Sequence, residues 1–221
     1  MTKSIILLSG GLDSLVSLGL SKEKYNIELA ITFDYGQKSA LYEIEASKNI
    51  CDYYKIKHEV IKLDWLKNIT HTALVSGDEI PEGAGLLDST NSMKQVWVPN
   101  RNGLFLNIAA SYADSDDYNY IFIGANREEG QTFSDNTPEF VEKINGEFEY
   151  STMCHAKVVA PLIDCDKTEI VKKAIEHNIP LELVRSCYKN GGKHCGVCES
   201  CVRLKAALIN NHAEKYLKIL F

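Results

Sequence analysis

A short run near the N-terminus, Ser9–Ser14 (SGGLDS), carries residue types that suit phosphate binding. It follows an apolar run over residues 5–8 and precedes an apolar-periodic stretch from Leu15, an order typical of a buried strand, a tight turn and a helix. Adjacent glycines let the backbone approach a ligand closely, and a helix start presents unpaired N–H groups. The spacing fits an anion cradle, and it fits equally an ordinary turn in which Asp13 or Ser14 caps the helix.

Two common nucleotide-binding motifs do not match this run. A Walker A loop needs a Lys-Ser/Thr pair after its second glycine, and here Leu12 and Asp13 follow Gly11. The G-x-G-x-x-G spacing of dinucleotide-binding folds is also absent. A phosphate site at this position is therefore of another kind.

Four cysteines near the C-terminus form the second chemically suggestive pattern, namely Cys187, Cys195, Cys198 and Cys201. Four thiolates within one short segment match tetrahedral zinc and leave no open position, which predicts a structural site. The alternative is an iron–sulfur cluster, because C-x-x-C-x-x-C also begins the ferredoxin motif. The Cys-Pro of that motif is missing here, so we favour zinc. The other cysteines have no such spacing, and helix packing is the expected place of Cys51.

Several single residues are candidates for ligand contacts. Asp13 lies beside the glycine turn and could hold Mg²⁺, which prefers oxygen ligands. Asp34 is a further acidic candidate at the cleft, as is Glu43, for which the solvated face of a helix is the alternative. Arg101 could bind a carboxylate or phosphate with its fork, although from sequence alone a surface position is favoured. The histidines show no metal spacing.

The chain alternates strands and helices. Strands are predicted at residues 5–8, 27–33, 58–63, 120–125 and 158–163, and helices at 13–24, 39–55, 103–113, 139–144, from the Asp166–Glu169 capping box onward, and at 199–211. Residues 64–100, interrupted by Gly77, Pro81, Gly83 and Gly85, and residues 126–138 are predicted to be irregular.

This alternation predicts an α/β fold, a Rossmann-like doubly wound parallel sheet with helices on both faces. We expect residues 1–180 to form the nucleotide-binding domain and residues 181–221 a small zinc-binding helical segment packed on it. The 221 residues carry a net charge of −6, which argues against stable nucleic-acid binding. There is no apolar run of bilayer length and no signal peptide, so a cytoplasmic location is expected.

The SGGLDS run resembles the SGGxDS signature of the PP-loop ATP pyrophosphatases, whose fold is of the HUP type. Further stretches extend the resemblance over nearly the whole chain to the 7-cyano-7-deazaguanine synthase family, which makes preQ0, the nitrile precursor of queuosine and archaeosine. They are DYGQK at 34–38, VPNRN at 98–102, GAN at 124–126, PLI at 161–163, KTEI at 167–170 and the four-cysteine segment.

The resemblance implies a ligase that uses ATP, Mg²⁺ and Zn²⁺. The carboxylate of 7-carboxy-7-deazaguanine attacks ATP to give an acyl adenylate, ammonia gives the amide, and a second activation by ATP gives the nitrile. It also implies a homodimer. Alternatives are a tRNA-thiolating or other tRNA-modifying PP-loop enzyme, an amide-forming ligase acting on another carboxylate, and a non-enzymatic zinc-ribbon module.

The resemblance also assigns residues to sites. Asp13 and Ser14 are the catalytic candidates, and the four cysteines are the zinc ligands. The ATP site is predicted to comprise Leu7, Leu8, Ser9, Gly10, Gly11, Leu12, Asp13, Ser14, Leu15, Val16 and Ser17. Candidates for substrate contact in the cleft are Asp34, Tyr35, Gln37, Glu43, Asn100, Arg101, Asn126, Arg127 and Asp135.

One stretch departs from the family pattern. Many members have Tyr-Pro-Asp-Cys-Arg after the GxN turn, whereas residues 127–136 here read REEGQTFSDN. Asp135 corresponds in position to that aspartate, but the cysteine and the arginine are missing. Our hypothesis is that Arg127 supplies the missing positive charge. The departure leaves room for an altered acceptor.

Overall fold

The computed structural model describes residues 2–76, 80, 82 and 96–221. Its centre is a five-stranded sheet in the order β3-β2-β1-β4-β5, in which all pairings are parallel. This order confirms the predicted doubly wound topology. The strands are β1 (Lys3–Leu7), β2 (Asn26–Asp34), β3 (Lys57–Lys62), β4 (Tyr120–Phe122) and β5 (Lys157–Val159).

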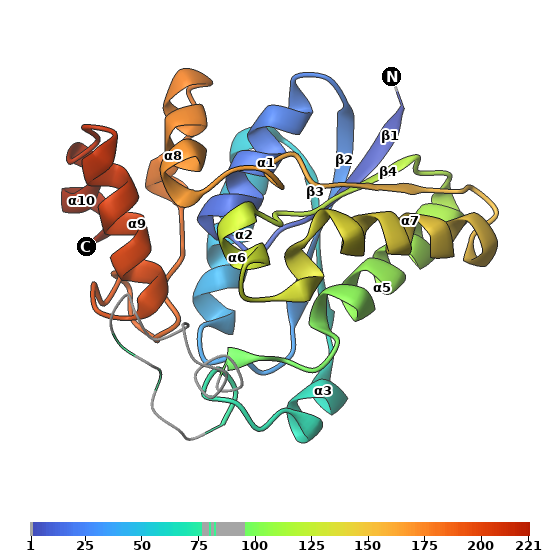
Figure 1. The fold of residues 1–221 in the computed structure, drawn as a ribbon, viewed down its shortest axis with the longest axis horizontal. Helices are drawn as coiled ribbons and strands as arrows, with labels where there is room; N and C mark the ends of the chain where they lie inside the picture. The colour runs from blue at the N-terminus through green and yellow to red at the C-terminus, as the bar shows by residue number, and fades with distance from the viewer. Residues whose placement is uncertain (1, 77–79, 81, 83–95) are drawn as a thin grey trace.

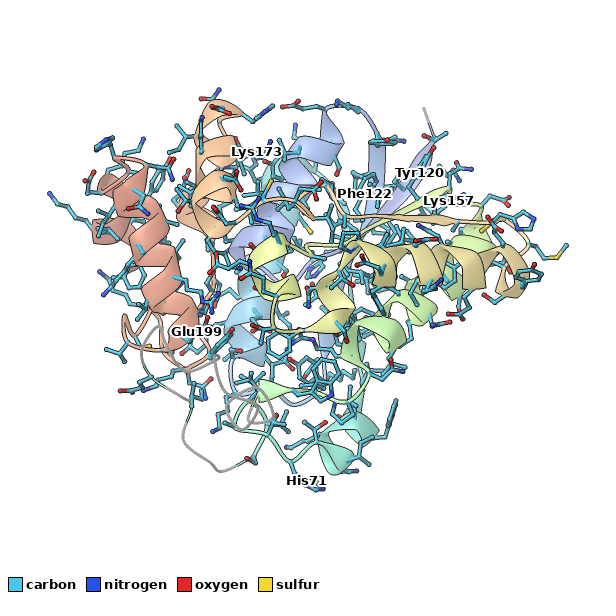
Figure 2. All side chains as sticks on the ribbon, in the orientation of Figure 1. His71, Tyr120, Phe122, Lys157, Lys173 and Glu199 are labelled. Atoms are coloured by element: carbon cyan, nitrogen blue, oxygen red, sulfur yellow. The ribbon has the colours of Figure 1, made fainter. Side chains whose placement is uncertain are left out.

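Helices cover both faces of the sheet (Figure 1). On one face α1 (Leu12–Lys22), α2 (Ala40–Tyr54) and α8 (Lys167–Glu176) pack in a core that contains Ile6 and Phe122. On the other face α5 (Arg101–Asp116) and α7 (Pro138–Ser151) pack in a core that contains Ile5 and Ile121. Neighbouring residues of one strand thus enter opposite cores, because successive side chains of a strand point to opposite faces. Tyr120 and Phe122 of β4, labelled in Figure 2, both contact the first core.

The C-terminal segment continues the first core rather than standing apart from it. Helix α9 (Glu199–Asn210) places Leu204 and Leu208 in the same apolar cluster as α1 and α8, and α10 (Lys215–Leu220) adds Leu220. Figure 1 shows α8, α9 and α10 together on one side of the molecule. No helix in residues 2–76 or 96–221 is long and apolar enough to cross a bilayer.

Several predicted boundaries are wrong. Short helices occur at α3 (Asp64–Ile69) and α10, where none was predicted, and the irregular stretch 126–138 contains α6 (Arg127–Gly130) and the 3-10 helix η2 (Ser134–Asn136). A second 3-10 helix, η3 (Leu181–Leu183), follows α8. The breakers at positions 77, 81, 83 and 85 lie outside the described residues.

Strands β4 and β5 are shorter than predicted, because the chain leaves the sheet early. A Cβ on Gly124 would lie 2.9 Å from the backbone nitrogen of Ser14, so the segment after β4 passes directly against the start of α1. Apolar character alone does not distinguish this crossing segment from strand.

The capping box that the sequence predicts at the start of α8 is present. Asp166 Oδ1 accepts from the Glu169 N–H (2.9 Å), and Glu169 Oε2 accepts from the Asp166 N–H (2.9 Å). Asp166→Ala is expected to lower the free energy of unfolding by about 1 kcal/mol. Urea denaturation measures this, with Asp164→Ala as the control because Asp164 is exposed and caps no helix. Equal midpoints for the two variants would contradict the assignment.

Candidate active site and metal centre

The glycine turn after β1 has a conformation that only glycine meets without strain. Gly10 has φ +76°, and a Cβ there would lie 2.9 Å from Ala46 Cβ and from the Glu43 carbonyl oxygen. Ser14 Oγ accepts from the Ser9 N–H (3.3 Å) and donates to the Gly11 carbonyl (3.1 Å). These bonds hold the turn closed around the start of α1.

Neither Asp13 nor Ser14 caps the start of α1, and the Leu12 N–H donates instead to Ser186 Oγ (3.4 Å). Gly11 is the N-cap residue of α1 and has no side-chain hydrogen bond. The alternative in which Asp13 or Ser14 merely caps the helix is therefore wrong. The positive end of the helix dipole and the serine hydroxyls still face whatever lies in front of the turn, which is the arrangement of an anion site.

A cavity of about 230 Å³ lies in front of this turn, and we call it cavity 1. The residues of the predicted ATP site that line it are Leu7, Leu8, Ser9, Gly11, Leu12, Asp13 and Ser14. The other predicted residues lie behind it. Leu15, Val16 and Ser17 are completely buried in α1, and Gly10 packs against α2.

The carboxyl end of β2 forms one wall of cavity 1. Tyr35, Gln37 and Glu43 line it, as predicted, and Asp34 does not. Glu43 accepts hydrogen bonds from Gln37 Nε2 (2.8 Å) and from Ser39 Oγ (2.6 Å). Burial raises the pKa of Glu43. This carboxyl therefore belongs to the cleft and not to a solvated helix face, whereas Asp34 accepts the Gly36 N–H at the turn (3.1 Å).

Arg101 is not a surface residue. It begins α5, lines cavity 1 and is hydrogen-bonded to Tyr35. Burial opposes its charge, but the phenol of Tyr35 holds the pKa of Arg101 above its usual value. The preceding Asn100 has φ 50° and does not line the cavity, whereas the following Asn102 lines it and donates to the Asp135 carbonyl oxygen (3.2 Å).

A largely buried lysine, which was not among the predicted site residues, joins two carboxylates at the cavity. Lys167 Nζ donates to Asp13 Oδ2 (2.6 Å) and to Glu129 Oε1 (2.7 Å). Burial raises the pKa of Asp13 to about 6 despite this lysine. Lys167 itself keeps a pKa above its usual value, because the two carboxylates outweigh its own burial. Its place at the first position of α8, inside the capping box and in the KTEI stretch of the family resemblance, was the available signal.

The environment of Asp13 fits a bound cation. Its second oxygen, Oδ1, is buried and has no hydrogen-bond partner among the described residues. A buried carboxylate oxygen without a partner is costly unless a ligand satisfies it. A hard divalent cation carried in with phosphates is such a ligand, so the residues present fit Mg²⁺.

A second cavity of about 80 Å³, cavity 2, adjoins the first. Both are lined by Arg101, Glu129, Lys167 and Tyr188. Asp135, a predicted substrate contact, lines cavity 2. Figure 2 shows Glu199, which also lines cavity 2, at the N-terminal end of α9.

Two further predicted contacts lie elsewhere. Asn126 is fully buried and caps α6 through the Glu129 N–H (3.0 Å). Arg127 binds Asp166 (3.1 Å) and Glu169 (2.9 Å) with a half-exposed side chain, and it lines neither cavity. The hypothesis that Arg127 replaces a missing substrate-binding cation is therefore not supported, because its charge is used on the capping box of α8.

The four C-terminal cysteines converge as predicted. The Sγ atoms of Cys187, Cys195, Cys198 and Cys201 all lie within 4.8 Å of one another. Cys187 Sγ accepts from the Cys195 N–H (3.4 Å), and Cys195 Sγ accepts from the Cys198 N–H (3.3 Å). Backbone N–H bonds to sulfur stabilise thiolates, and four thiolates form a metal-binding site with no protein position left open.

The metal-binding segment also supplies part of cavity 1. Arg185, Ser186 and Tyr188 line it. The Arg185 N–H donates to the Gly10 carbonyl (2.7 Å), and its guanidinium lies 4.8 Å from the ring of Tyr42. None of these three residues was predicted from the sequence. The metal site thus fixes the loop that closes one side of the cavity.

Taken together, a doubly wound parallel sheet, a glycine turn opening on a cavity and a four-thiolate site define an α/β enzyme of the ATP-using PP-loop class. The family model described as queuosine biosynthesis protein QueC matches residues 3–212. The chain belongs to the QueC family.

Individual relatives agree with this assignment. The chain is 52% identical over 211 residues to the 7-cyano-7-deazaguanine synthase of Carboxydothermus hydrogenoformans, covering 94% of this chain and 98% of that one. It is 48% identical over 217 residues to that of Methanosarcina mazei, covering 94% of both. Among solved structures, NMN synthetase from Francisella tularensis superposes with a TM-score of 0.50 at 15% identity, covering 96% of this chain and 84% of that one, which is a likeness of fold alone.

Proposed function

We propose that this chain converts 7-carboxy-7-deazaguanine and ammonia to 7-cyano-7-deazaguanine at the expense of ATP. The observation that carries the proposal is the glycine turn at Ser9–Ser14 opening on cavity 1, in a member of this family. The substrate carboxylate attacks the α-phosphate of ATP, which releases pyrophosphate and leaves an acyl adenylate. Ammonia then displaces AMP to give the amide, and a second adenylation of the amide oxygen permits elimination to the nitrile.

The chain contributes binding and charge rather than a covalent nucleophile. The positive end of the α1 dipole and the hydroxyls of Ser9 and Ser14 face the leaving pyrophosphate. Asp13 would hold Mg²⁺, which supplies positive charge to the phosphate oxygens. Lys167 keeps Asp13 and Glu129 neutralised beside these anions.

We propose zinc as the metal at the four cysteines, in a structural role, because four thiolates match its tetrahedral preference. The reduced thiols that this requires favour a cytoplasmic location.

The test is mass spectrometry of the products formed from ATP, Mg²⁺, ammonium and 7-carboxy-7-deazaguanine, with AMP and ADP quantified alongside. Nitrile formed together with AMP is the expected result. Amide as the final product would instead identify a ligase that stops after the first activation. Absence of both, with ATP bound, would overturn the proposed acceptor and leave the nucleotide site in place.

A further inference from the structure

Two aromatic side chains form one wall of cavity 2. The rings of Trp97 and Phe133 stack with centroids 5.9 Å apart and an interplanar angle of 22°, and both residues line the cavity. Apolar aromatic surface with a few charged groups placed around it is typical of sites for planar heterocycles. Because cavity 2 shares lining residues with cavity 1, a ring bound there would lie next to the proposed ATP site.

Among the carboxylates of cavity 2, Asp135 differs from the others. Glu129 is bound to Lys167, and Glu199 is bound to Arg203. Asp135 accepts one hydrogen bond from Asn136 Nδ2 (3.0 Å) and forms no salt bridge within residues 2–76 and 96–221. Burial raises the pKa of Asp135, partly offset by the charge of Arg101. This half-satisfied, half-buried carboxylate is suited to a ligand that offers N–H donors.

Arg101 is the matching cation. It lines both cavities, and in the part of the chain that the structure describes its guanidinium has Tyr35 as a hydrogen-bond partner but no salt bridge to a carboxylate. The guanidinium fork binds carboxylates with two parallel hydrogen bonds. Asp135 and Glu129 lie near enough to act on its charge, but neither forms a salt bridge with it, so this arginine at the junction of two cavities is suited to an anionic group on the ligand.

We propose that cavity 2 binds the pyrimidine edge of the deazaguanine, with Asp135 accepting its ring N–H and exocyclic amino hydrogens and Arg101 holding the 7-carboxylate. This inference rests on the proposed function and adds the orientation of the substrate. The ligand carries a donor pair at one end and a carboxylate at the other, and the aromatic wall covers the ring between them. Adenine does not fit the same position, because the corresponding edge offers a donor beside an acceptor.

The orientation has a consequence for the reaction. With the pyrimidine edge in cavity 2, the carboxylate held by Arg101 faces cavity 1, where the turn at Ser9–Ser14 binds the phosphates of ATP. Asp135 thus sets which base is accepted, and Arg101 sets which atom meets the α-phosphate.

The first experiment compares 7-carboxy-7-deazaguanine with its analogue lacking the 2-amino group. Wild-type protein is expected to prefer the natural substrate by roughly 100-fold in kcat/KM, because the analogue leaves the carboxylate of Asp135 unpaired. In Asp135→Asn the preference is expected to fall below about fivefold, since an amide loses one acceptor. Asp164→Asn makes the same chemical change at an exposed site and should keep the wild-type preference.

The second experiment measures binding without turnover. Trp65 and Trp97 are the two tryptophans of the chain, so a Trp65→Phe background leaves Trp97 as a fluorescent reporter of cavity 2. Arg101→Met is expected to weaken binding of the 7-carboxylate by at least roughly 10-fold, and binding of the uncharged nitrile by less than about twofold. Asp135→Asn is expected to weaken both ligands alike.

The outcomes separate this inference from the proposed function. Failure of the wild type to form nitrile would remove the function itself. If the wild type forms nitrile but Asp135→Asn still prefers the natural substrate over the analogue without the 2-amino group as strongly as the wild type does, the proposed orientation is overturned and the proposed function stands. ATP affinity within about twofold of wild type shows that a variant is folded. If Arg101→Met weakens binding of the 7-carboxylate and of the nitrile equally, the assignment of Arg101 to the carboxylate is overturned.

Discussion

Replacing Lys167 with methionine is expected to lower ATP-dependent product formation on the order of 10²–10³-fold. Its ammonium is the shared donor to Asp13 and Glu129 beside the phosphate site. Without it two partly buried carboxylates face an incoming polyanion. The same change is expected to destabilise the fold by about 1–3 kcal/mol, because it leaves partly buried charge without its partner. Steady-state release of AMP and urea denaturation measure the two effects.

A matched control and a second variant separate chemistry from folding. Lys172→Met removes a lysine of the same helix whose side chain is 67% exposed. It should leave the rate of AMP release and the free energy of unfolding near their wild-type values. The double variant Asp13→Asn, Lys167→Met should recover part of the lost stability without recovering activity, because it removes the uncompensated charge but not the need for a cation. Wild-type turnover in Lys167→Met would contradict the role assigned to this lysine.

The features predicted correctly from the sequence are those whose signal is local. The turn at Ser9–Ser14, the four cysteines and the capping box at Asp166 each depend on residues within a few positions of one another. A parallel sheet with helices on both faces follows from the alternation of strands and helices, because crossover connections restrict the topology. Local spacing thus indicated the turn and the cysteine cluster, whereas phosphate binding at the turn was an interpretation that the family resemblance favoured.

The residues that were missed or misplaced depend on contacts between distant parts of the chain. Lys167 meets Asp13 across 154 positions, and no local pattern marks that pair. Arg101 stands between two asparagines, which suggests a surface loop, yet the start of α5 places it against Tyr35. Arg127, chosen for its position in a divergent stretch, is instead used by the acidic residues of the α8 capping box. The sequence identifies chemically able residues, and only the fold shows which of them share a cavity.

Loss of one thiolate from the four-cysteine site is expected to abolish product formation. Cys198→Ser should release the metal, because metal binding at such sites contributes on the order of 10 kcal/mol and requires the full ligand set. That contribution is comparable to the stability of a whole domain. The segment from residue 181 onward is then expected to become sensitive to protease. Metal content by mass spectrometry, limited proteolysis and nitrile formation measure the three effects.

The functional loss follows from position rather than from chemistry at the metal. Arg185, Ser186 and Tyr188 lie within two positions of Cys187 and line cavity 1, so a released segment removes one wall of that cavity. Cys154→Ser is the control, because that half-buried thiol lies outside the cluster. ATP affinity should therefore fall in Cys198→Ser and stay unchanged in the control. A Cys198→Ser protein that lost its metal yet bound ATP normally would show that the loop is held by the core through Leu204 and Leu208, and not by the thiolates.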